Sequence, residues 1–482
     1  MTPGEPGELR WPAWADLALL LLVALALRLP GLFTFDLWQD EIYSIYEAKY
    51  LYDSPIGPGG IELRALYFWL LHPLADAFTR SYPLLRLPSL LFGLLGIAVT
   101  WTIARRYLGR APAFLAAAIV TALPLHVATS QMIRWVALVA LVGALLGGAL
   151  LRALERDAAR DHLRVLACML VGTLTQVTFL LPAAGLLLGA HLVRRDGRLG
   201  VPWPTAAAWR WCWLPYLVVM AAYYGALFTL VPHERLLGEA TGSDPGRLLP
   251  AFVYHLSPAL LVLAGAAGLW LATRPEVPLR RIGWMAGCGM LVPMALQLVG
   301  GAAGLVPVSI LYVMASVPIL AVAAGGAVLP LATDDRRRMT LAAGAALLWG
   351  ASIAPTLASH LLDGSRFEFR RPLRAIEAKD PGAAVLINPA VHAKWETPGL
   401  EWIELRTAAT TRFLDSLVGA RDHFWVLATL RRNGMPFDPD GSKLRWLQRR
   451  CARDAAYRTP RIDYERYDVE VYRCPAPAEA AP

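Results

Sequence analysis

Long apolar runs separated by short arginine-rich segments constrain this sequence more than any other feature. Runs long enough to cross a bilayer lie at about 15–33, 84–104, 211–231, 251–272, 282–302, 309–331 and 339–359. Hydrophobic residues make up 56% of the 482 residues, and the mean hydropathy is +0.44. A soluble domain of this size cannot bury so many apolar runs. The sequence therefore predicts an α-helical polytopic membrane protein.

Two further apolar stretches, 112–151 and 165–193, each have the length of one long helix or of two short ones. Five segments between the runs are rich in arginine and together hold 17 Arg and Lys residues: 105–111, 152–164, 194–210, 273–281 and 332–338. Because short basic loops face the cytoplasm, each ambiguous stretch must cross an even number of times. We therefore predict two helix pairs, which turn near 126–135 and near 178–182, and about 11 transmembrane helices in all.

The parity of these crossings predicts a cytoplasmic N-terminus and an extracytoplasmic C-terminal domain on the plasma (inner) membrane. The residues after the first run are bulky or charged, so we expect this run to stay as a signal anchor. The positive residues behind the formal net charge of +9 cluster in short segments between the apolar runs, as in the cytoplasmic loops of membrane proteins. We therefore expect membrane lipids as partners and no nucleic acid.

From about residue 360 the chain becomes polar. Strands are predicted at 383–388, 400–405, 424–430 and 469–474, and helices at 407–420 and 442–451. We predict a transmembrane domain at 1–359, a small α/β extracytoplasmic domain at 360–474 and a disordered tail at 475–482. In an oxidising compartment, Cys451 and Cys474 could form a disulfide.

The first predicted outer loop, 34–83, holds seven acidic residues, among them the adjacent pair Asp40 and Glu41 at the mouth of the first span. Ionisable groups at a membrane face are costly and usually functional, although solvated loop acids are the simpler alternative. Within the same loop, residues 62–78 have the pattern of an amphipathic helix that lies on the membrane. This loop is therefore the first candidate for chemistry.

Several short stretches follow one another along the chain in a characteristic order. They are Trp38-Gln39-Asp40-Glu41, Leu85-Arg86-Leu87-Pro88-Ser89, Ala104-Arg105-Arg106, Leu123-Pro124-Leu125-His126, Ser130-Gln131 with Arg134, and the late Leu311-Tyr312 with Pro318. In this order they resemble the bacterial protein-mannosyltransferase superfamily, the GT-C glycosyltransferases of the family 39 type. The resemblance implies a GT-C-like fold and a polyprenyl-phosphate-sugar donor. The acceptor would be a lipid, a glycan or a protein.

Site roles follow from this resemblance and from the chemistry of glycosyl transfer, which needs a base for the acceptor and positive charge for the departing phosphate. Asp40 is the expected base, with Glu41 beside it. Arg134 is the expected phosphate ligand, since its guanidinium fork matches a phosphate. The expected substrate-binding set also contains Gln131, Glu62, Arg64, Tyr67, His126 and Tyr312.

Arg28 and Arg86 are expected to anchor helix ends at the membrane interface. His126 and His255 lie near predicted outer ends of spans and could line the site, although a lone histidine is more often a packing residue. No acidic metal cage is evident, so we expect no metal and no cofactor.

Two departures from the family pattern leave alternatives open. Met132 stands where relatives usually have an acid, and Leu311 stands where many have arginine. These changes keep a second hypothesis in view, a catalytically weakened protein that binds polyprenyl lipids or acts as a scaffold in envelope assembly. A transporter is disfavoured, because the spans carry few charges and no internal repeat stands out. An Asp40→Asn variant would separate the enzyme from the scaffold.

Overall fold

A computed structural model describes residues 12–51, 64–195, 198–230, 248–303, 308–362, 369–388, 391–405, 410–430, 438, 440–457 and 468–475. It divides into two compact units. The helical unit comprises Met1–Leu32 and Glu47–Leu357, and the C-terminal unit comprises Phe33–Tyr46 and Ala358–Pro482. The domain limits expected from the sequence remain a prediction. The division by contacts groups a short N-terminal segment with residues more than 300 positions later.

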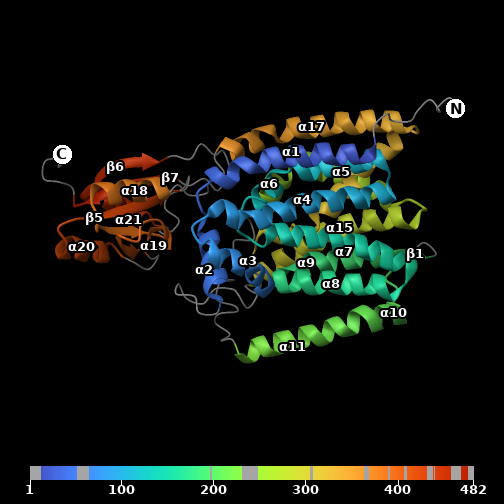
Figure 1. The fold of residues 1–482 in the computed structure, drawn as a ribbon, viewed down its shortest axis with the longest axis horizontal. Helices are drawn as coiled ribbons and strands as arrows, with labels where there is room; N and C mark the ends of the chain where they lie inside the picture. Colours follow the sequence, from blue (N-terminus) through green and yellow to red (C-terminus); the bar gives the residue numbers. More distant parts are fainter. Residues whose placement is uncertain are drawn as a thin grey trace. The chain divides into compact units, whose positions relative to one another are not determined.

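Within the described residues, five helices are long and apolar enough to cross a bilayer: α1 (Ala13–Thr34), α4 (Tyr82–Tyr107), α7 (Val136–Arg156), α15 (Val277–Ala302) and α17 (Asp335–Leu362). In the helical unit, α1, α4, α7 and α15 run alongside one another (Figure 1). Helices α13 (Leu248–Leu256) and α14 (Pro258–Ala272) form a sixth candidate only as a pair that is bent by 86°. The chain is thus a multi-pass membrane protein, and the count of 11 spans stays a prediction.

The two ambiguous apolar stretches are both broken, as the arginine pattern predicts. The first consists of α5 (Arg110–Ala122), the short α6 (Pro124–Thr129) and α7, with a turn over residues 130–135. The second consists of α8 (Ala159–Thr175), a 3-10 turn η3 (Val177–Phe179) and α9 (Leu180–His191). The first break falls at Pro124, where proline disfavours helical backbone for the residue before it. Both predicted turning points are confirmed.

Two runs that read as continuous spans are interrupted instead. The run 251–272 breaks between α13 and α14 at Ser257, whose φ of 66° lies in the left-handed region. Pro258 follows it and starts the next helix. The run 309–331 consists of η7 (Ile310–Val313), α16 (Val317–Gly325) and η8 (Gly326–Leu331). Hydrophobicity alone does not reveal these breaks, because the interrupting residues are themselves small or apolar.

Shorter elements complete the helical unit: α3 (Ala65–Ala77), the hairpin β1 (Val193–Arg195) with β2 (Arg198–Gly200), α10 (Ala206–Ala208), the π-helical turn η4 (Trp209–Trp213) and α11 (Leu214–Leu230). Helix α2 (Gln39–Tyr50) connects the two units. The predicted amphipathic helix 62–78 is confirmed as a helix over Ala65–Ala77, and its location on the membrane surface stays a prediction. Its face with Phe68 and Leu71 is buried, whereas Trp69 and Leu70 are exposed.

Helices α9 and α15 pack with their backbones in close approach. Gly185 and Gly189 lie four residues apart on α9, and a Cβ atom on either would collide with a backbone carbonyl of α15, at Cys288 and Trp284 respectively. Small residues at this spacing let helices in membranes approach closely. The α9–α15 contact therefore depends on both glycines.

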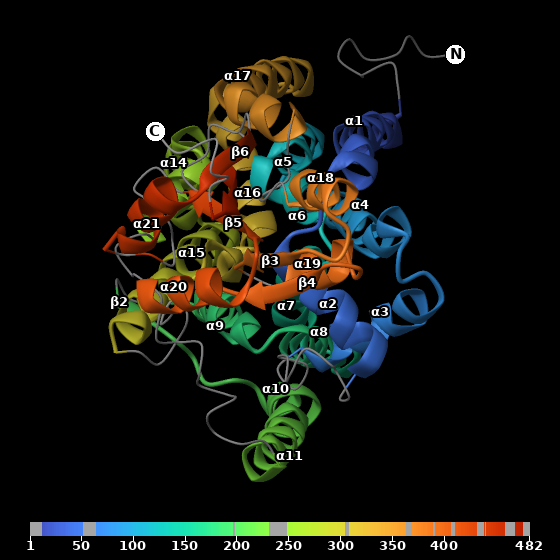
Figure 2. The same cartoon turned by 90° about the vertical axis from the view of Figure 1, so that its left-hand side faces the viewer.

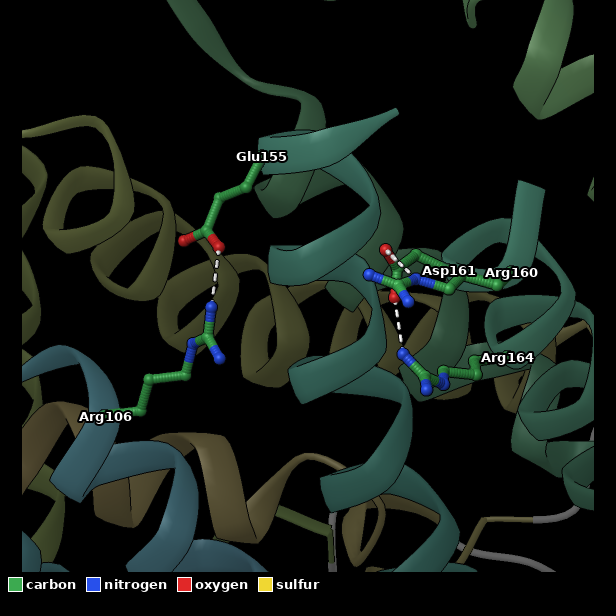
Figure 3. A network of polar contacts seen from close by, with 5 residues as sticks. All are labelled: Arg106, Glu155, Arg160, Asp161 and Arg164. Atoms are coloured by element: carbon green, nitrogen blue, oxygen red, sulfur yellow. Dashed lines mark hydrogen bonds and ion pairs between the residues drawn. The ribbon is translucent and has the colours of Figure 1, made fainter. Parts of the chain in front are cut away.

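Ion pairs link the arginine-rich helix ends that we predict to be cytoplasmic. Arg106 of α4 contacts Glu155 of α7 at 3.3 Å (Figure 3). Asp161, at the start of α8, accepts a hydrogen bond from Arg164 at 2.6 Å. Arg110 of α5 donates two hydrogen bonds to Asp16 of α1, at 2.6 and 3.0 Å. The Arg106–Glu155 and Arg110–Asp16 pairs therefore join neighbouring helices, whereas the Asp161–Arg164 pair lies within α8.

The C-terminal unit contains a five-stranded mixed sheet (Figures 1 and 2). Its order is β4 (Glu401–Glu404), β3 (Ala384–Ile387), β5 (Phe424–Leu430), β7 (Asp468–Cys474), β6 (Ala452–Tyr457). Strand β3 is parallel to β4 and β5, and β7 is antiparallel to β5 and β6. The four predicted strands are confirmed, and β6 was not predicted.

Alternating side chains give this sheet two buried faces. Val385 and Ile387 pack with Leu373 of α18 (Arg370–Lys379), whereas Ala384 and Leu386 face the opposite side. That side is covered by α20 (Thr411–Ala420) and α21 (Ser442–Arg450), the two predicted helices. Helices α18 and α19 (Val391–Glu396) were not predicted. A three-layer α/β unit results, as the fold prediction requires.

Cys451 and Cys474 form a disulfide, with their Cα atoms 4.4 Å apart. The bond closes a loop across 23 positions and joins the end of α21 to the end of β7. The proposed pairing is thus confirmed. The other three cysteines, Cys168, Cys212 and Cys288, are free thiols.

Candidate functional site

Arg28 of α1 is fully buried, with 0% exposure, and its guanidinium joins three helices of the helical unit. One terminal nitrogen donates to the carbonyl oxygens of Ala24 and Thr121, both at 3.0 Å. The other nitrogen lies 2.9 Å from Nδ1 of His126. The sequence had suggested an interfacial anchor, and this expectation is wrong. The side chain instead links α1 to the end of α5 and to α6.

The hydrogen bond from Arg28 determines which nitrogen of the His126 ring carries the proton. A guanidinium only donates, so Nδ1 of His126 accepts and the neutral ring carries its proton on Nε2. The ring is fully buried against α4, where a Cβ atom at Gly96 would lie 3.6 Å from Nε2. Among the described residues, Nε2 has no hydrogen-bond partner. His126 is therefore a buried acceptor for Arg28.

Gln131 binds the same end of α1. Its side-chain amide donates to the carbonyl oxygens of Arg28 at 2.8 Å and of Leu27 at 3.4 Å. A few residues further on, Arg86 of α4 donates to the carbonyls of Gly31 at 3.2 Å and Leu32 at 3.4 Å. Arg86 is only 1% exposed, so its expected role as an interfacial anchor is also wrong. Arg86 thus satisfies carbonyls in the last turn of α1 that have no intrahelical partner, and Gln131 binds the turn before it.

Arg134 and Tyr312 both lie near the ring of Trp135. The Arg134 guanidinium lies 6.0 Å from the Trp135 ring, and that ring stacks on Tyr312 with centroids 6.1 Å apart. Ser89 of α4 donates a hydrogen bond to the Arg134 carbonyl at 3.2 Å. The structure thus brings together two expected site residues that are far apart in sequence. The Gln131–His126 pair forms a second group around Arg28.

Arg64 and Tyr67 have contacts in another part of the helical unit. Arg64 donates to the side-chain oxygen of Gln176 at 2.9 Å, which ties the start of α3 to the end of α8. Tyr67 is buried on α3, with its ring 5.7 Å from that of Phe68. Glu62 lies outside the described residues. The contacts above connect neither Arg64 nor Tyr67 to Arg134.

Asp40 and Glu41 occupy the first turn of α2, in the part of the chain that groups with the C-terminal unit. A Glu41 carboxylate oxygen accepts a hydrogen bond from the backbone N–H of Trp38 at 2.9 Å. This is the reciprocal half of a capping box, in which the third helical residue reaches back to the residue before the helix. Glu41 is 2% exposed, whereas Asp40 is half-buried. The two adjacent acids therefore differ in environment.

The segment around this motif packs on C-terminal residues of its own unit. Arg370 of α18 lies 4.0 Å from Asp36, and the rings of Phe35 and His360 meet edge to face with centroids 5.2 Å apart. Tyr46 makes a similar contact with Trp395 of α19, also at 5.2 Å. Sequence reasoning missed Arg370, since no local pattern connects it with the motif. Arg28, in contrast, carried a signal: it is an ionisable residue within an apolar run.

An open cavity of about 580 Å³ lies in the helical unit beside the break at Ser257. Its walls include Leu249 and Ile353, and Tyr254 and His255 also line it. Within the described ranges, no three His, Cys, Asp or Glu side chains gather as metal ligands would. The cavity therefore offers apolar walls with a few polar groups, as is usual for small-molecule sites.

Comparison with known proteins gives both a family match and a fold match. Residues 65–223 match the family model described as dolichyl-phosphate-mannose-protein mannosyltransferase. No curated protein matches the chain in sequence. Crystal structures of ArnT from Cupriavidus metallidurans are similar in fold: the apo form has a TM-score of 0.62 at 16% identity, over 95% of this chain and 98% of that one. The form bound to undecaprenyl phosphate has a TM-score of 0.56 at 14% identity, with the same coverage.

An oligosaccharyltransferase from Archaeoglobus fulgidus is also similar, with a TM-score of 0.53 at 12% identity. The match covers 86% of this chain and 67% of that one. A second structure of the same protein carries a tethered acceptor peptide. At these identities the similarity shows the fold, and the family model adds a sequence signature over α3 to α11.

Proposed function

We infer that this chain is a glycosyltransferase of the GT-C superfamily, because its fold and its sequence signature both indicate that group. The mannosyltransferase signature covers 65–223, and the ArnT-like fold extends over 95% of the chain. The agreement between these two independent comparisons is the observation that carries the assignment. Both kinds of structural relative belong to this superfamily.

The proposed reaction transfers a sugar from a polyprenyl-phosphate-linked donor to a lipid, glycan or protein acceptor. Undecaprenyl phosphate is bound in one ArnT structure, and this supports a donor of that class. We assign the apolar chain of the donor to the cavity beside Ser257, whose walls suit an isoprenoid. If the chain binds polyprenyl phosphate without transferring sugar, its role would instead be that of a lipid-binding scaffold.

Asp40 is the proposed general base for the acceptor. Glu41 already caps α2 through the Trp38 N–H, so we assign it to holding the helix. Asp40 has the greater exposure of the two. Its carboxylate would take the acceptor proton as the new glycosidic bond forms.

Arg134 is the proposed phosphate ligand. Its guanidinium lies beside Trp135, and Ser89 holds its backbone from α4. The positive charge would stabilise the negative charge that builds up on the departing phosphate. An Arg134→Gln variant should weaken the binding of undecaprenyl phosphate, which native mass spectrometry can measure. Equal binding by the variant would contradict this role.

The decisive experiment compares wild type with Asp40→Asn in cells, using mass spectrometry of envelope lipids, glycans and proteins. We expect a sugar-sized mass that depends on wild type and falls by about 10²- to 10⁴-fold in the variant, the usual cost of losing a general base. Asp76→Asn is the matched control, because Asp76 is an exposed carboxylate on α3 in the same predicted loop. Full activity of Asp40→Asn would remove the base assignment and favour the scaffold.

The proposed topology has the N-terminus in the cytoplasm and the C-terminal unit outside the plasma membrane. The Cys451–Cys474 disulfide supports a location of the C-terminal unit outside the cytoplasm, because such bonds persist in oxidising compartments. An alkaline phosphatase fusion at the C-terminus should be active in cells, and a green fluorescent protein fusion should be dark. The reverse result would invert the orientation.

A further inference from the structure

The segment that carries Asp40 groups with residues from the other end of the chain. Phe33–Tyr46 forms one compact unit with Ala358–Pro482. Two isoleucines of α2, Ile42 and Ile45, are fully buried, so this helix has a defined packed face. The position of Asp40 therefore depends on what holds the beginning of this segment.

Arg370 stands between two carboxylates at this point. Its NH1 nitrogen lies 4.0 Å from Asp36, and its Nε lies 3.7 Å from Glu396 of α19. A second arginine of α18, Arg374, approaches the same Glu396 oxygen at 3.9 Å. The Glu396 side chain is only 4% exposed and that of Asp36 only 16% exposed, whereas that of Arg370 is 38% exposed. The carboxylates are thus shielded from water on one side of each pair, so the pairs keep more of their Coulomb energy than fully exposed pairs do.

Two aromatic contacts restrain the same segment, one at Phe35 beside Asp36 and one at Tyr46 within α2. Phe35 meets His360 edge to face, and Tyr46 meets Trp395 in the same way. Such pairs contribute roughly 0.5–1.5 kcal/mol each beyond the burial of their area. The aromatic contacts hold the segment against His360 at the end of α17 and against Trp395 of α19. The ion pair between Asp36 and Arg370 in addition fixes which residue of the segment faces α18.

We propose that Arg370 is a positioning residue, which holds Asp36 against α18 and thereby sets the position of Asp40, four residues further along the chain. This inference rests on the proposed function, because it assigns Arg370 a part in the same transfer reaction. Arg370 is not proposed to touch the donor or the acceptor. Its effect passes through the Asp36 contact to the first turn of α2, where Glu41 caps the helix.

The consequence for catalysis is a loss of rate without a loss of affinity. Misplacing a reacting group by about 1 Å can cost about 100-fold in rate. The donor, in contrast, is proposed to bind through Arg134 and the cavity beside Ser257, which belong to the helical unit. Releasing Asp36 should therefore lower kcat and leave the KM for the donor nearly unchanged.

The test is a double-mutant cycle in the full-length protein with Asp36→Asn, Arg370→Gln and both together. Arg450→Gln is the matched control, because Arg450 is an exposed arginine at the end of α21 in the same unit. Two readouts are taken for each variant: hydrogen exchange of the α2 backbone amides, and kcat and KM for sugar transfer from the polyprenyl-phosphate donor. The exchange readout does not depend on any activity.

We expect faster exchange in α2 and a fall in kcat of about 10- to 100-fold in each single variant, with KM within about twofold of wild type. The double variant should behave like Arg370→Gln in both readouts, because that change already removes the contact with Asp36. Unchanged exchange in Arg370→Gln would overturn the proposal. Faster exchange with an unchanged kcat would overturn the catalytic part.

An inactive wild-type protein would overturn the proposed function, and with it the catalytic part of this proposal. Exchange would still decide whether Arg370 holds the segment. The two failures are thus distinguishable.

Discussion

At the scale of single residues, the buried pair of Arg28 and His126 determines how the end of α1 is held. The guanidinium is fully buried and donates to two carbonyls and one ring nitrogen. Breaking such a contact from one side is costly, because it leaves a buried donor without its acceptor. A substitution at this pair should therefore change stability through the lost hydrogen bond more than through the change in side-chain volume.

Replacing His126 with leucine should destabilise the protein by about 3 kcal/mol, since the Arg28 charge stays buried and loses an acceptor. His126→Gln should cost less, because the side-chain carbonyl can still accept from Arg28. Thermal unfolding of the purified protein in detergent, followed by fluorescence, measures both variants. Equal melting temperatures for the two variants would show that the ring only fills space.

The sequence predicted residue identity better than residue role. Arg134 and Tyr312 were singled out by the order of motifs, and they do lie around Trp135. Arg28 and Arg86 were misassigned, because an arginine near the end of a span looks the same whether it reaches the headgroups or turns inward to carbonyls. The sequence does not distinguish the adjacent acids Asp40 and Glu41, whereas the structure does, through the Trp38 contact and the deeper burial of Glu41.

At the scale of elements, the contact between α9 and α15 depends on glycine. Gly189→Ala should destabilise the protein by about 1–3 kcal/mol, because its Cβ would collide with the backbone of α15 at Trp284. Gly287→Ala is the control within α15 itself, since nothing lies within 4 Å of a Cβ there. This variant should be neutral or stabilise by up to about 1 kcal/mol. A comparison of melting temperatures tests the pair, and equal shifts would contradict the account.

A carboxylate at the end of α18 should make the C-terminal unit sensitive to acid. Burial alone raises the pKa of Asp380, but hydrogen bonds from Trp425 at 2.8 Å and His423 at 2.6 Å outweigh it and lower that pKa below its ordinary value. A lowered pKa gives stability that is complete above the ordinary value of about 4 and is lost as the pH falls through the folded value.

Hydrogen exchange of β3 and β5 amides between about pH 3 and pH 6 measures this effect. Wild type should lose protection relative to Asp380→Asn as the pH falls. Comparing both proteins at each pH removes the intrinsic pH dependence of exchange. If the difference between them were constant with pH, Asp380 would not be the responsible group.

Element types were predictable where the pattern was strong. The arginine-rich segments required an even number of crossings, which correctly predicted the breaks within 112–151 and 165–193. In the polar region, short apolar segments correctly predicted β3, β4, β5 and β7. The kink at Ser257 was not predicted, because the length of the apolar run outweighed the signal of Pro258, which disfavours helical backbone at the residue before it. Helix α18 was missed because its arginines mask the apolar face formed by Leu373 and Ile376.

At the scale of the whole molecule, the disulfide fixes one side of the C-terminal unit. Replacing Cys451 and Cys474 with serine should destabilise this unit by about 3 kcal/mol, through the loop entropy that the bond removes from the unfolded chain. Limited proteolysis of the membrane-embedded protein should then cut within 358–482 at lower denaturant concentration. An unchanged proteolysis midpoint would mean that the sheet alone holds the unit.

The discontinuous C-terminal unit also has a consequence for biosynthesis. Phe33–Tyr46 leaves the ribosome early, but the residues it packs with begin at Ala358. Roughly 310 residues separate the two parts, so at about 5–20 residues per second the early segment waits for tens of seconds. During that interval, Asp40 lacks the neighbours that fix its place. The nascent chain can therefore insert its first helices while its acidic motif is still unassembled, and the proposed base gains its neighbours only after the residues from Ala358 onward have been made.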